Sequence, residues 1–213
     1  MTTTIDTRTA ADAALEEVLP QVWRWVDPGV SDRCGTALST GDGTVLIDPP
    51  AIGAEDRQRL EAEAGPIKHV LLTSARHAAL AGVYRGAGVT VWAPQAAAGG
   101  DDGPEIDHLF GYEDRLPGGV LPLQLPEAAA PDEVAYLWPS AGEGLLITGD
   151  VLPVVGQTPV YREGDAPPMD AYLDAVKALL VAEPGTLAPA HQAPPEEQVI
   201  YATAWAAHIG SMT

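Results

Sequence analysis

Apolar and polar residues alternate near the start of the chain with the period of two that is typical of β-strands. Between Val22 and Val26, valines and Arg24 fall on one face and two tryptophans on the other. The same reasoning predicts further strands over Cys34–Thr40 and Thr44–Ile47, with turns at Asp27-Pro-Gly and Gly41-Asp-Gly. The opening of the chain is therefore expected to be a strand meander, preceded by a short helix over Ala11–Val18.

Strands and helices alternate in the next part of the chain. The pattern predicts, in order, a helix over Glu55–Ala64, a strand from His69, a helix over Ala78–Gly86, a strand over Thr90–Ala93, a helical turn over Pro94–Ala98 and a long acidic loop over Gly99–Pro117. A buried strand that leads directly into a helix is the βα unit of an α/β protein, and such folds place their chemistry at the strand's carboxyl end.

Three strands and two helices account for most of the remaining sequence. The expected elements are strands over Val120–Leu125, Glu133–Trp138 and Leu145–Thr148, an irregular segment over Val151–Pro168, an amphipathic helix over Met169–Glu183, a strand over Thr186–Pro189 and a final helix over Glu196–Ile209. The sequence shows no internal repeat and no low-complexity linker. We therefore expect one domain over residues 11–213, after a flexible segment at 1–10.

Composition excludes several classes of partner. The formal net charge is −19, and the only lysines are Lys68 and Lys177, so nucleic acid and anionic membranes are not expected partners. No apolar run approaches the length that spans a bilayer, and the first residues lack the pattern of a secretory signal, so a cytoplasmic protein is expected. The single cysteine, Cys34, excludes an intramolecular disulfide and is expected to be a small buried residue.

Four short segments carry the residues most relevant to function. They are HVLLTSARHAALAGV at 69–83, Leu46-Ile47-Asp48-Pro49, the strand that ends in Gly149-Asp150, and Pro189-Ala190-His191-Gln192. Together they resemble motifs of the metallo-β-lactamase-fold hydrolases, the glyoxalase II and lactonase-like relatives. In that family an apolar strand ends in Thr-His-x-His-x-Asp-His. The resemblance implies an α/β fold of the αββα type, with two mixed β-sheets packed face to face and helices on the outside.

The family's metal ligands are mostly absent from the matching positions. Thr73 and Gly82 match the first motif, but the ligand positions of this motif and of a later turn hold Ser74, Arg76, Ala78, Ala79 and Ala129. Two ligand positions are retained, at Asp150 and His191. Because an alanine side chain cannot bind a metal, the resemblance implies no dinuclear site, and no cofactor is expected.

Two residues leave an alternative open. His77 lies one position from a ligand, and with Asp150 and His191 it would supply the three protein ligands that a single zinc or iron ion needs. Against this, one position on a helix is a rotation of about 100° that would point His77 elsewhere. Arg76 carries a permanent positive charge, and we hypothesise that its guanidinium takes the place of the metal and neutralises Asp150. The simpler interpretation is an exposed arginine at a helix start.

Three functions are consistent with these residues. The first is a protein that binds a small molecule in the former active-site cleft, or is catalytically silent. The second is an enzyme that hydrolyses an ester, thioester or lactone, either with one metal ion or without metal through Arg76, His77, Asp150 and His191. The third is a homodimer in which Trp23, Trp25 and Trp92 form the interface, although aromatic residues in strands are more often part of a core. Asp48 is interpreted as a turn-capping carboxylate.

Overall fold

The computed structural model describes most of the chain between residues 15 and 201. The described residues are 15–27, 30–74, 76–77, 81–85, 88–97, 106–127, 129–130, 132–152, 154–155, 158–159, 168–190, 192–193 and 200–201. The expected flexible segment at 1–10 lies outside them, as does most of the expected final helix. No helix in these ranges is long and apolar enough to cross a membrane.

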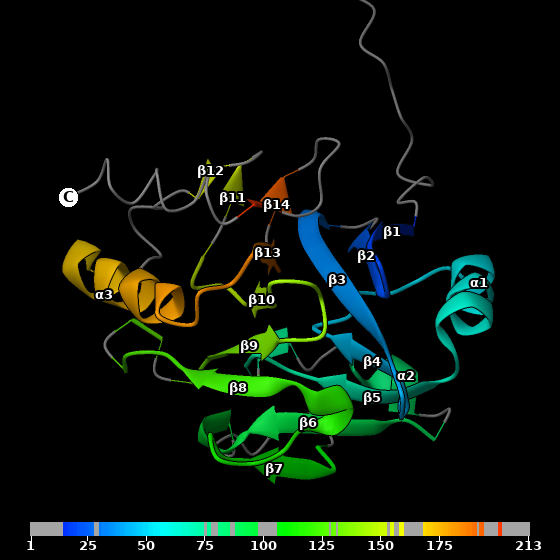
Figure 1. Cartoon of the computed structure of the whole chain (residues 1–213). Helices are drawn as coiled ribbons and strands as arrows, with labels where there is room; N and C mark the ends of the chain where they lie inside the picture. Colours follow the sequence, from blue (N-terminus) through cyan, green and yellow to red (C-terminus); the bar gives the residue numbers. More distant parts are fainter. Residues whose placement is uncertain are drawn as a thin grey trace, which may run out of the picture.

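Two mixed β-sheets make up the centre of the molecule (Figure 1). The seven-stranded sheet contains, in spatial order, β1 (Glu16–Leu19), β2 (Val22–Asp27), β3 (Val30–Thr40), β4 (Gly43–Ile47), β5 (Ile67–Leu71), β6 (Thr90–Pro94) and β7 (His108–Phe110). Its first strands pair antiparallel, whereas β4 to β7 pair parallel. The parallel half is the part expected from the alternation of strands and helices, since parallel strands need a crossover connection.

The second sheet has five strands and runs β15 (Ile200–Tyr201), β13 (Thr186–Pro189), β10 (Leu145–Thr148), β9 (Val134–Trp138) and β8 (Leu121–Gln124). Among the described strands of this sheet, only β10 and β13 pair in parallel. A small third sheet joins β12 (Thr158–Pro159), β11 (Val154–Val155) and β14 (Gln192–Ala193).

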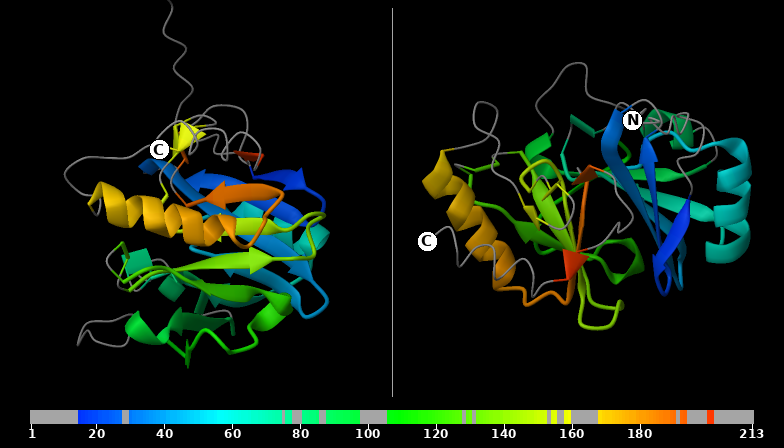
Figure 2. Two further views of the ribbon diagram at one scale, coloured as in Figure 1. Left: turned by 60° about the vertical axis from the view of Figure 1, so that its left-hand side comes forward. Right: turned by 90° about the horizontal axis from the view of Figure 1, so that it is seen from above.

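Helices cover the outer faces of the two main sheets (Figure 2). In the view from above, α1 (Ala54–Ala64) lies outside the seven-stranded sheet and α3 (Met169–Leu180) outside the five-stranded sheet. The short helix α2 (Ala81–Arg85) and two single turns, η2 (Gln95–Ala97) and η3 (Pro117–Gly119), complete the described elements. The expected order of layers, helix, sheet, sheet, helix, is confirmed.

The alternation of side chains divides the core into three layers. Between the two sheets pack residues such as Leu38, Ile47, Tyr136 and Ile147. The opposite face of the seven-stranded sheet packs under α1 and α2, and the opposite face of the five-stranded sheet packs under α3. Because both faces of the inner strands are covered, β10 is buried at every position, as its uninterrupted apolar sequence predicts.

Most expected elements are confirmed, and four are wrong in part. The segment Val151–Pro168, expected to be irregular, contains β11 and β12, which pair with each other. Glu16–Leu19 forms a strand rather than the end of a helix, since it pairs antiparallel with β2. The acidic loop contains β7, which pairs with β6 at the edge of the sheet. Ile200–Tyr201 is a strand that pairs with β13, at a place where a helix was expected.

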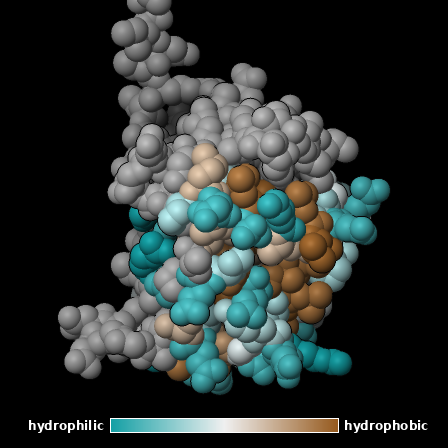
Figure 3. Space-filling model, turned by 90° about the vertical axis from the view of Figure 1, so that its left-hand side faces the viewer, coloured by the Kyte–Doolittle hydropathy of each residue, from teal (hydrophilic) through white to brown (hydrophobic). Residues whose placement is uncertain are grey.

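Aromatic and apolar side chains are distributed as in an ordinary core. Trp23 and Trp25 are buried on β2, and Cys34 is buried on β3. These tryptophans therefore do not form the exposed patch that the homodimer hypothesis requires. On the face that carries α3, hydrophobic and hydrophilic side chains lie intermixed (Figure 3), and Met169 and Val181 at the two ends of this helix are exposed.

Candidate functional site

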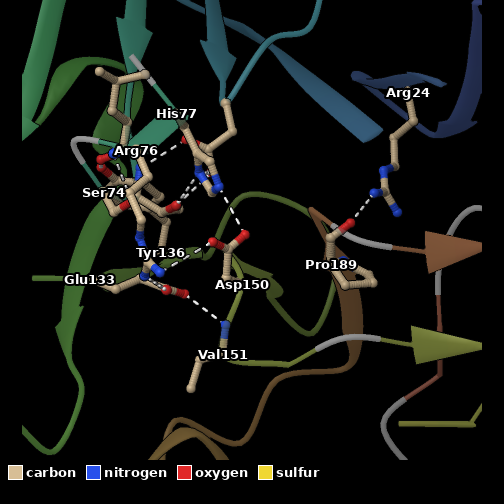
Figure 4. A network of polar contacts seen from close by, with 12 residues as sticks. Arg24, Ser74, Arg76, His77, Glu133, Tyr136, Asp150, Val151 and Pro189 are labelled. Carbon is tan, nitrogen blue, oxygen red and sulfur yellow. Dashed lines mark hydrogen bonds and ion pairs between the residues drawn. The ribbon is translucent and has the colours of Figure 1, made fainter. Parts of the chain in front are cut away.

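The candidate site lies where β4, β5 and β10 end. Asp48 follows β4, the turn with Thr73, Arg76 and His77 follows β5, and Asp150 follows β10. Neighbouring parallel strands bring the first two segments together, since Ile47 pairs with Leu71. Figure 4 shows that side chains from both main sheets converge at this point.

Asp48 fixes the turn that follows β5. Its backbone has a positive φ of 43°, which aspartate tolerates better than most residues, and its N–H donates to the carbonyl of Leu71. Its Oδ1 accepts the backbone N–H of Thr73 at 2.9 Å, and its Oδ2 accepts the Thr73 hydroxyl at 2.6 Å. The carboxylate therefore caps the turn, as the sequence suggested, and also reaches a second partner.

That partner is His77, whose ring lies between two carboxylates. Its Nε2 is 2.9 Å from Oδ1 of Asp150, and its Nδ1 is 3.0 Å from Oδ2 of Asp48 and 2.9 Å from the Thr73 hydroxyl. The expectation that His77 points elsewhere is not met. The reason is local: the N–H of His77 bonds to the carbonyl of Ser74, so residue 77 is reached by a tight three-residue turn rather than by an α-helical rotation.

This arrangement favours the imidazolium. Burial alone would lower the pKa of His77, but the charges of Asp48 and Asp150 and their hydrogen bonds outweigh it and raise the pKa to about 11. Each ring nitrogen then carries a hydrogen that points at a carboxylate. A metal ion binds imidazole through a nitrogen lone pair, so His77 in this state offers none.

Arg76 lies over the same cluster but is less closely held. Its guanidinium is 3.8 Å from Oδ2 of Asp150, 3.4 Å from Oε2 of Glu133 and 3.8 Å from Asp132, and its side chain is 56% exposed. The distance to Asp150 is that of an ion pair and exceeds that of a hydrogen bond. The cation that hydrogen-bonds Asp150 is therefore His77, with Arg76 as a second, looser neighbour.

Glu133 is a member of the site that the sequence did not point to. Its carboxylate is buried, and Oε1 accepts the N–H of Val151 at 3.0 Å. Burial raises the pKa of Glu133 to about 7, although the hydrogen bond from Val151 opposes the shift. Gly149 makes this packing possible, because a Cβ there would lie 2.6 Å from Oε1 of Glu133. The available signal was a charged residue directly before the apolar strand β9.

The segment before His191 is tied to both sheets. The buried guanidinium of Arg24 on β2 donates to the carbonyl of Pro189, and the N–H of Cys34 donates to the carbonyl of Ala190 at 2.7 Å. The N–H of Ala190 in turn donates to the carbonyl of Thr148. His191 itself lies outside the described residues, so its position relative to Asp150 stays a prediction.

The remaining ligand positions divide into two groups. Ser74 is buried, with its hydroxyl bonded to the N–H of Arg76, and Ala129 packs against the apolar residues under α3. Ala78 and Ala79 lie outside the described residues. Within the described ranges no group of three or more His, Cys, Asp and Glu side chains is arranged to hold a metal ion.

The architecture was compared with known proteins. No protein-family model matches the sequence, and no curated protein is significantly similar to it. Among solved structures, a metallo-β-lactamase from Hirschia baltica superposes with a TM-score of 0.69 at 14% identity, over 93% of this chain and 96% of that one. The metallo-β-lactamase FIM-1 from Pseudomonas aeruginosa, in a mono-zinc form, superposes with a TM-score of 0.68 at 15% identity, over 93% of this chain and 95% of that one. A metallo-β-lactamase from Pontibacter korlensis superposes with a TM-score of 0.67 at 17% identity, over 92% of this chain and 98% of that one.

This chain has the metallo-β-lactamase fold. The resemblance seen in the short motifs therefore extends to the whole architecture, at a sequence identity that shows the fold alone. In this metallo-β-lactamase fold, the cluster of Asp48, His77 and Asp150 occupies the strand ends at which the sequence motifs locate the family's metal site.

The described residues do not fit a dinuclear metal centre. A metal centre needs several deprotonated donors that converge on one point. Here the first two ligand positions hold a serine and an arginine, and the imidazole next to them has both nitrogens directed at carboxylates. Among the described residues, the donors that remain at the retained positions are carboxylates that face protein cations.

Proposed function

We propose that this protein is not a conventional metallohydrolase and that the site at Asp150 acts on or binds a small molecule without metal. The observation that carries the proposal is the position of His77, hydrogen-bonded to Asp150 at 2.9 Å and 3.0 Å from Asp48. An imidazolium placed in this way supplies the positive charge that two neighbouring carboxylates require. A metal ion is then not needed to keep them together.

Exposure supports a binding role for the outer part of the cluster. The side chain of Asp150 is 32% exposed, and that of Arg76 is more exposed, whereas Asp48 and Glu133 are almost completely buried. Buried members hold the geometry, and exposed members are available to a ligand. Polar groups fixed by buried partners are the usual basis of a small-molecule site.

A hydrolase of esters, thioesters or lactones that uses one relocated metal ion is the second candidate. One observation favours it: His77 and Asp150, two of its three ligands, are in contact. Metal binding there requires His77 to lose a proton and to give up its hydrogen bond to at least one carboxylate. It also requires His191 as the third ligand. The cost of removing that proton favours the metal-free proposal.

Metal content separates the two candidates. The untagged protein is purified without chelator, analysed for metals, and then titrated with zinc, iron and manganese by calorimetry, alongside Asp150→Ala and His191→Ala. We expect less than one tenth of an equivalent of metal and no saturable binding. Binding of about one equivalent that both substitutions abolish would overturn the proposal and support the second candidate. A thermal-shift screen of esters, lactones and thioesters follows, with Asp150→Ala as the control for ligands bound at the site.

A further inference from the structure

The guanidinium of Arg76 lies among three carboxylates that come from two different connections between strands. Asp132 and Glu133 precede β9, and Asp150 follows β10 (Figure 4). The distances from the guanidinium are 3.8 Å to Asp132, 3.4 Å to Oε2 of Glu133 and 3.8 Å to Oδ2 of Asp150. An organic cation therefore already lies at this point of the site, and it belongs to the protein itself.

The side chain of Arg76 is held loosely, although its main chain is anchored. Its backbone N–H donates to the hydroxyl of Ser74 at 3.2 Å, whereas its side chain is 56% exposed. Its three ion pairs are all longer than the 2.9 Å contact between His77 and Asp150. An exposed ion pair of this kind is worth less than about 1 kcal/mol. A ligand that carries its own cation would therefore displace the guanidinium at small cost.

The charge of the site favours a cationic ligand in every protonation state. Four carboxylates and two basic side chains meet here: Asp48, Asp132, Glu133, Asp150, Arg76 and His77. With Glu133 protonated and His77 charged the net charge of this group is −1, and with Glu133 ionised and His77 neutral it is −3. The sign thus does not depend on the titration of either residue. An anionic ligand would be repelled, and a cationic ligand attracted.

We propose that Asp132, Glu133 and Asp150 bind an organic cation, a guanidinium or primary ammonium group of a small molecule, whose place Arg76 occupies when no ligand is bound. This inference rests on the proposed function, because it names the class of small molecule that the metal-free site binds. Arg76 acts as an internal competitor, and its guanidinium leaves the carboxylates when the ligand arrives. Asp132 and Asp150 are 38% and 32% exposed, so both are accessible to the ligand.

The chemistry of the resident group selects the probe. A guanidinium is planar and pairs with carboxylates through two parallel N–H groups. Propylguanidinium contains the same atoms as an arginine side chain, so it reproduces the group that the carboxylates already face. Butyrate is similar in length and carries the opposite charge.

The experiment uses the full, metal-free chain and measures binding of propylguanidinium by isothermal titration calorimetry at low ionic strength. Arg76→Ala leaves the carboxylates in place and removes the internal competitor. We expect it to bind propylguanidinium at least about 10-fold more tightly than the unmodified protein, because its site is no longer occupied. Added to Arg76→Ala, Asp132→Asn and Asp150→Asn should each weaken binding at least about fivefold. Butyrate should not bind.

Arg59→Ala is the matched control. It removes an exposed arginine that pairs with Glu63 on α1, and so changes the net charge of the protein by the same amount. It should leave the affinity for propylguanidinium as it is in the unmodified protein. Arg76→Gln keeps most of the side-chain length without the charge, and it should reproduce the gain of Arg76→Ala if that gain comes from the missing cation.

Each outcome decides between the hypotheses. Equal affinities for Arg76→Ala and Arg59→Ala would overturn this inference, because any binding would then follow from the net charge alone. Affinity that neither Asp132→Asn nor Asp150→Asn lowers would overturn it too, as would tighter binding of butyrate. These results leave the proposed function standing. Saturable binding of about one equivalent of zinc that Asp150→Ala and His191→Ala abolish overturns the proposed function itself.

Discussion

Replacement of His77 by Gln tests, through the stability of the fold, whether this residue carries a positive charge at the site. The imidazolium connects Asp48, which follows β4 of the seven-stranded sheet, with Asp150, which follows β10 of the five-stranded sheet. Glutamine is neutral and similar in reach, so it keeps at most part of the hydrogen bonding and none of the charge. Asp48, which is buried, then loses the cation that compensates it.

The expected magnitude follows from the pKa of His77. A rise from the ordinary value of 6.5 to about 11 links the imidazolium to about 6 kcal/mol of folding free energy, at about 1.4 kcal/mol for each pKa unit. Glutamine recovers part of this by hydrogen bonding. We therefore expect a loss of about 3–5 kcal/mol at pH 6, as found when one partner of a buried ion pair is removed.

Urea unfolding between pH 6 and pH 9 measures this effect. Because the folded pKa of His77 lies above the unfolded value, its contribution is complete below pH 6.5 and is lost as the pH rises toward 11. The difference between the unmodified protein and His77→Gln should therefore fall by about 3 kcal/mol between pH 6 and pH 9, which is most of its value at pH 6. Lys177→Gln removes an exposed ion pair on α3 and should cost less than about 1 kcal/mol.

A difference that grows with pH would refute this reasoning, since it would mean that His77 is neutral in the folded protein. Equal stabilities for His77→Gln and Lys177→Gln would refute it as well. In either case the carboxylates of Asp48 and Asp150 would need another source of positive charge, and a bound metal ion would become the better explanation.

Three other substitutions test separate parts of the site. Glu133→Gln should gain stability relative to the unmodified protein as the pH rises from 5 to 8, by up to about 3 kcal/mol. The reason is that burial raises the pKa of Glu133 to about 7, so its ionised form is disfavoured in the folded protein. Urea unfolding at pH 5 and pH 8 measures this gain. Gly149→Ala should cost about 1–3 kcal/mol and lower the Tm, since its Cβ would lie 2.6 Å from Oε1 of Glu133. Arg24→Ala should cost about 3 kcal/mol or more, because it leaves a cavity and removes the donor to the buried carbonyl of Pro189, and hydrogen exchange should show faster opening of β13.

The sequence predicted elements best where tertiary contacts and local pattern agree. The alternation in Val22–Val26 and the apolar run of Leu145–Thr148 both become strands of the two main sheets. The pattern failed for β7 because three residues are too few to show a period, and the strand forms through its pairing with β6. It failed for Glu16–Leu19 because pairing with β2 overrides the helical preference of a glutamate pair.

The chemistry of the site was less accessible from the sequence, for two physical reasons. The direction of His77 depends on the type of turn that follows β5, and one hydrogen bond between residues 77 and 74 changes that direction. Buried Glu133 accepts a hydrogen bond from Val151, which lies in a different connection between strands. No sequence pattern links these two positions. The motif segments that follow β4, β5 and β10 lie together in the fold, but the contacts between their side chains are set by long-range packing.

Charge balance also changes what the retained carboxylates mean. In the family that the motifs resemble, the counterpart of Asp48 orients the metal-binding turn and the counterpart of Asp150 bridges two metal ions, so Asp150 taken alone favours a metal site. In this structure each lies within hydrogen-bonding distance of the same imidazole, so the charge of a protonated His77 compensates part of their negative charge. A carboxylate at a motif position indicates a need for positive charge, and the neighbouring residues decide whether a metal ion or a side chain supplies it. In the proposed metal-free site this charge comes from His77, one position away from the family's ligand.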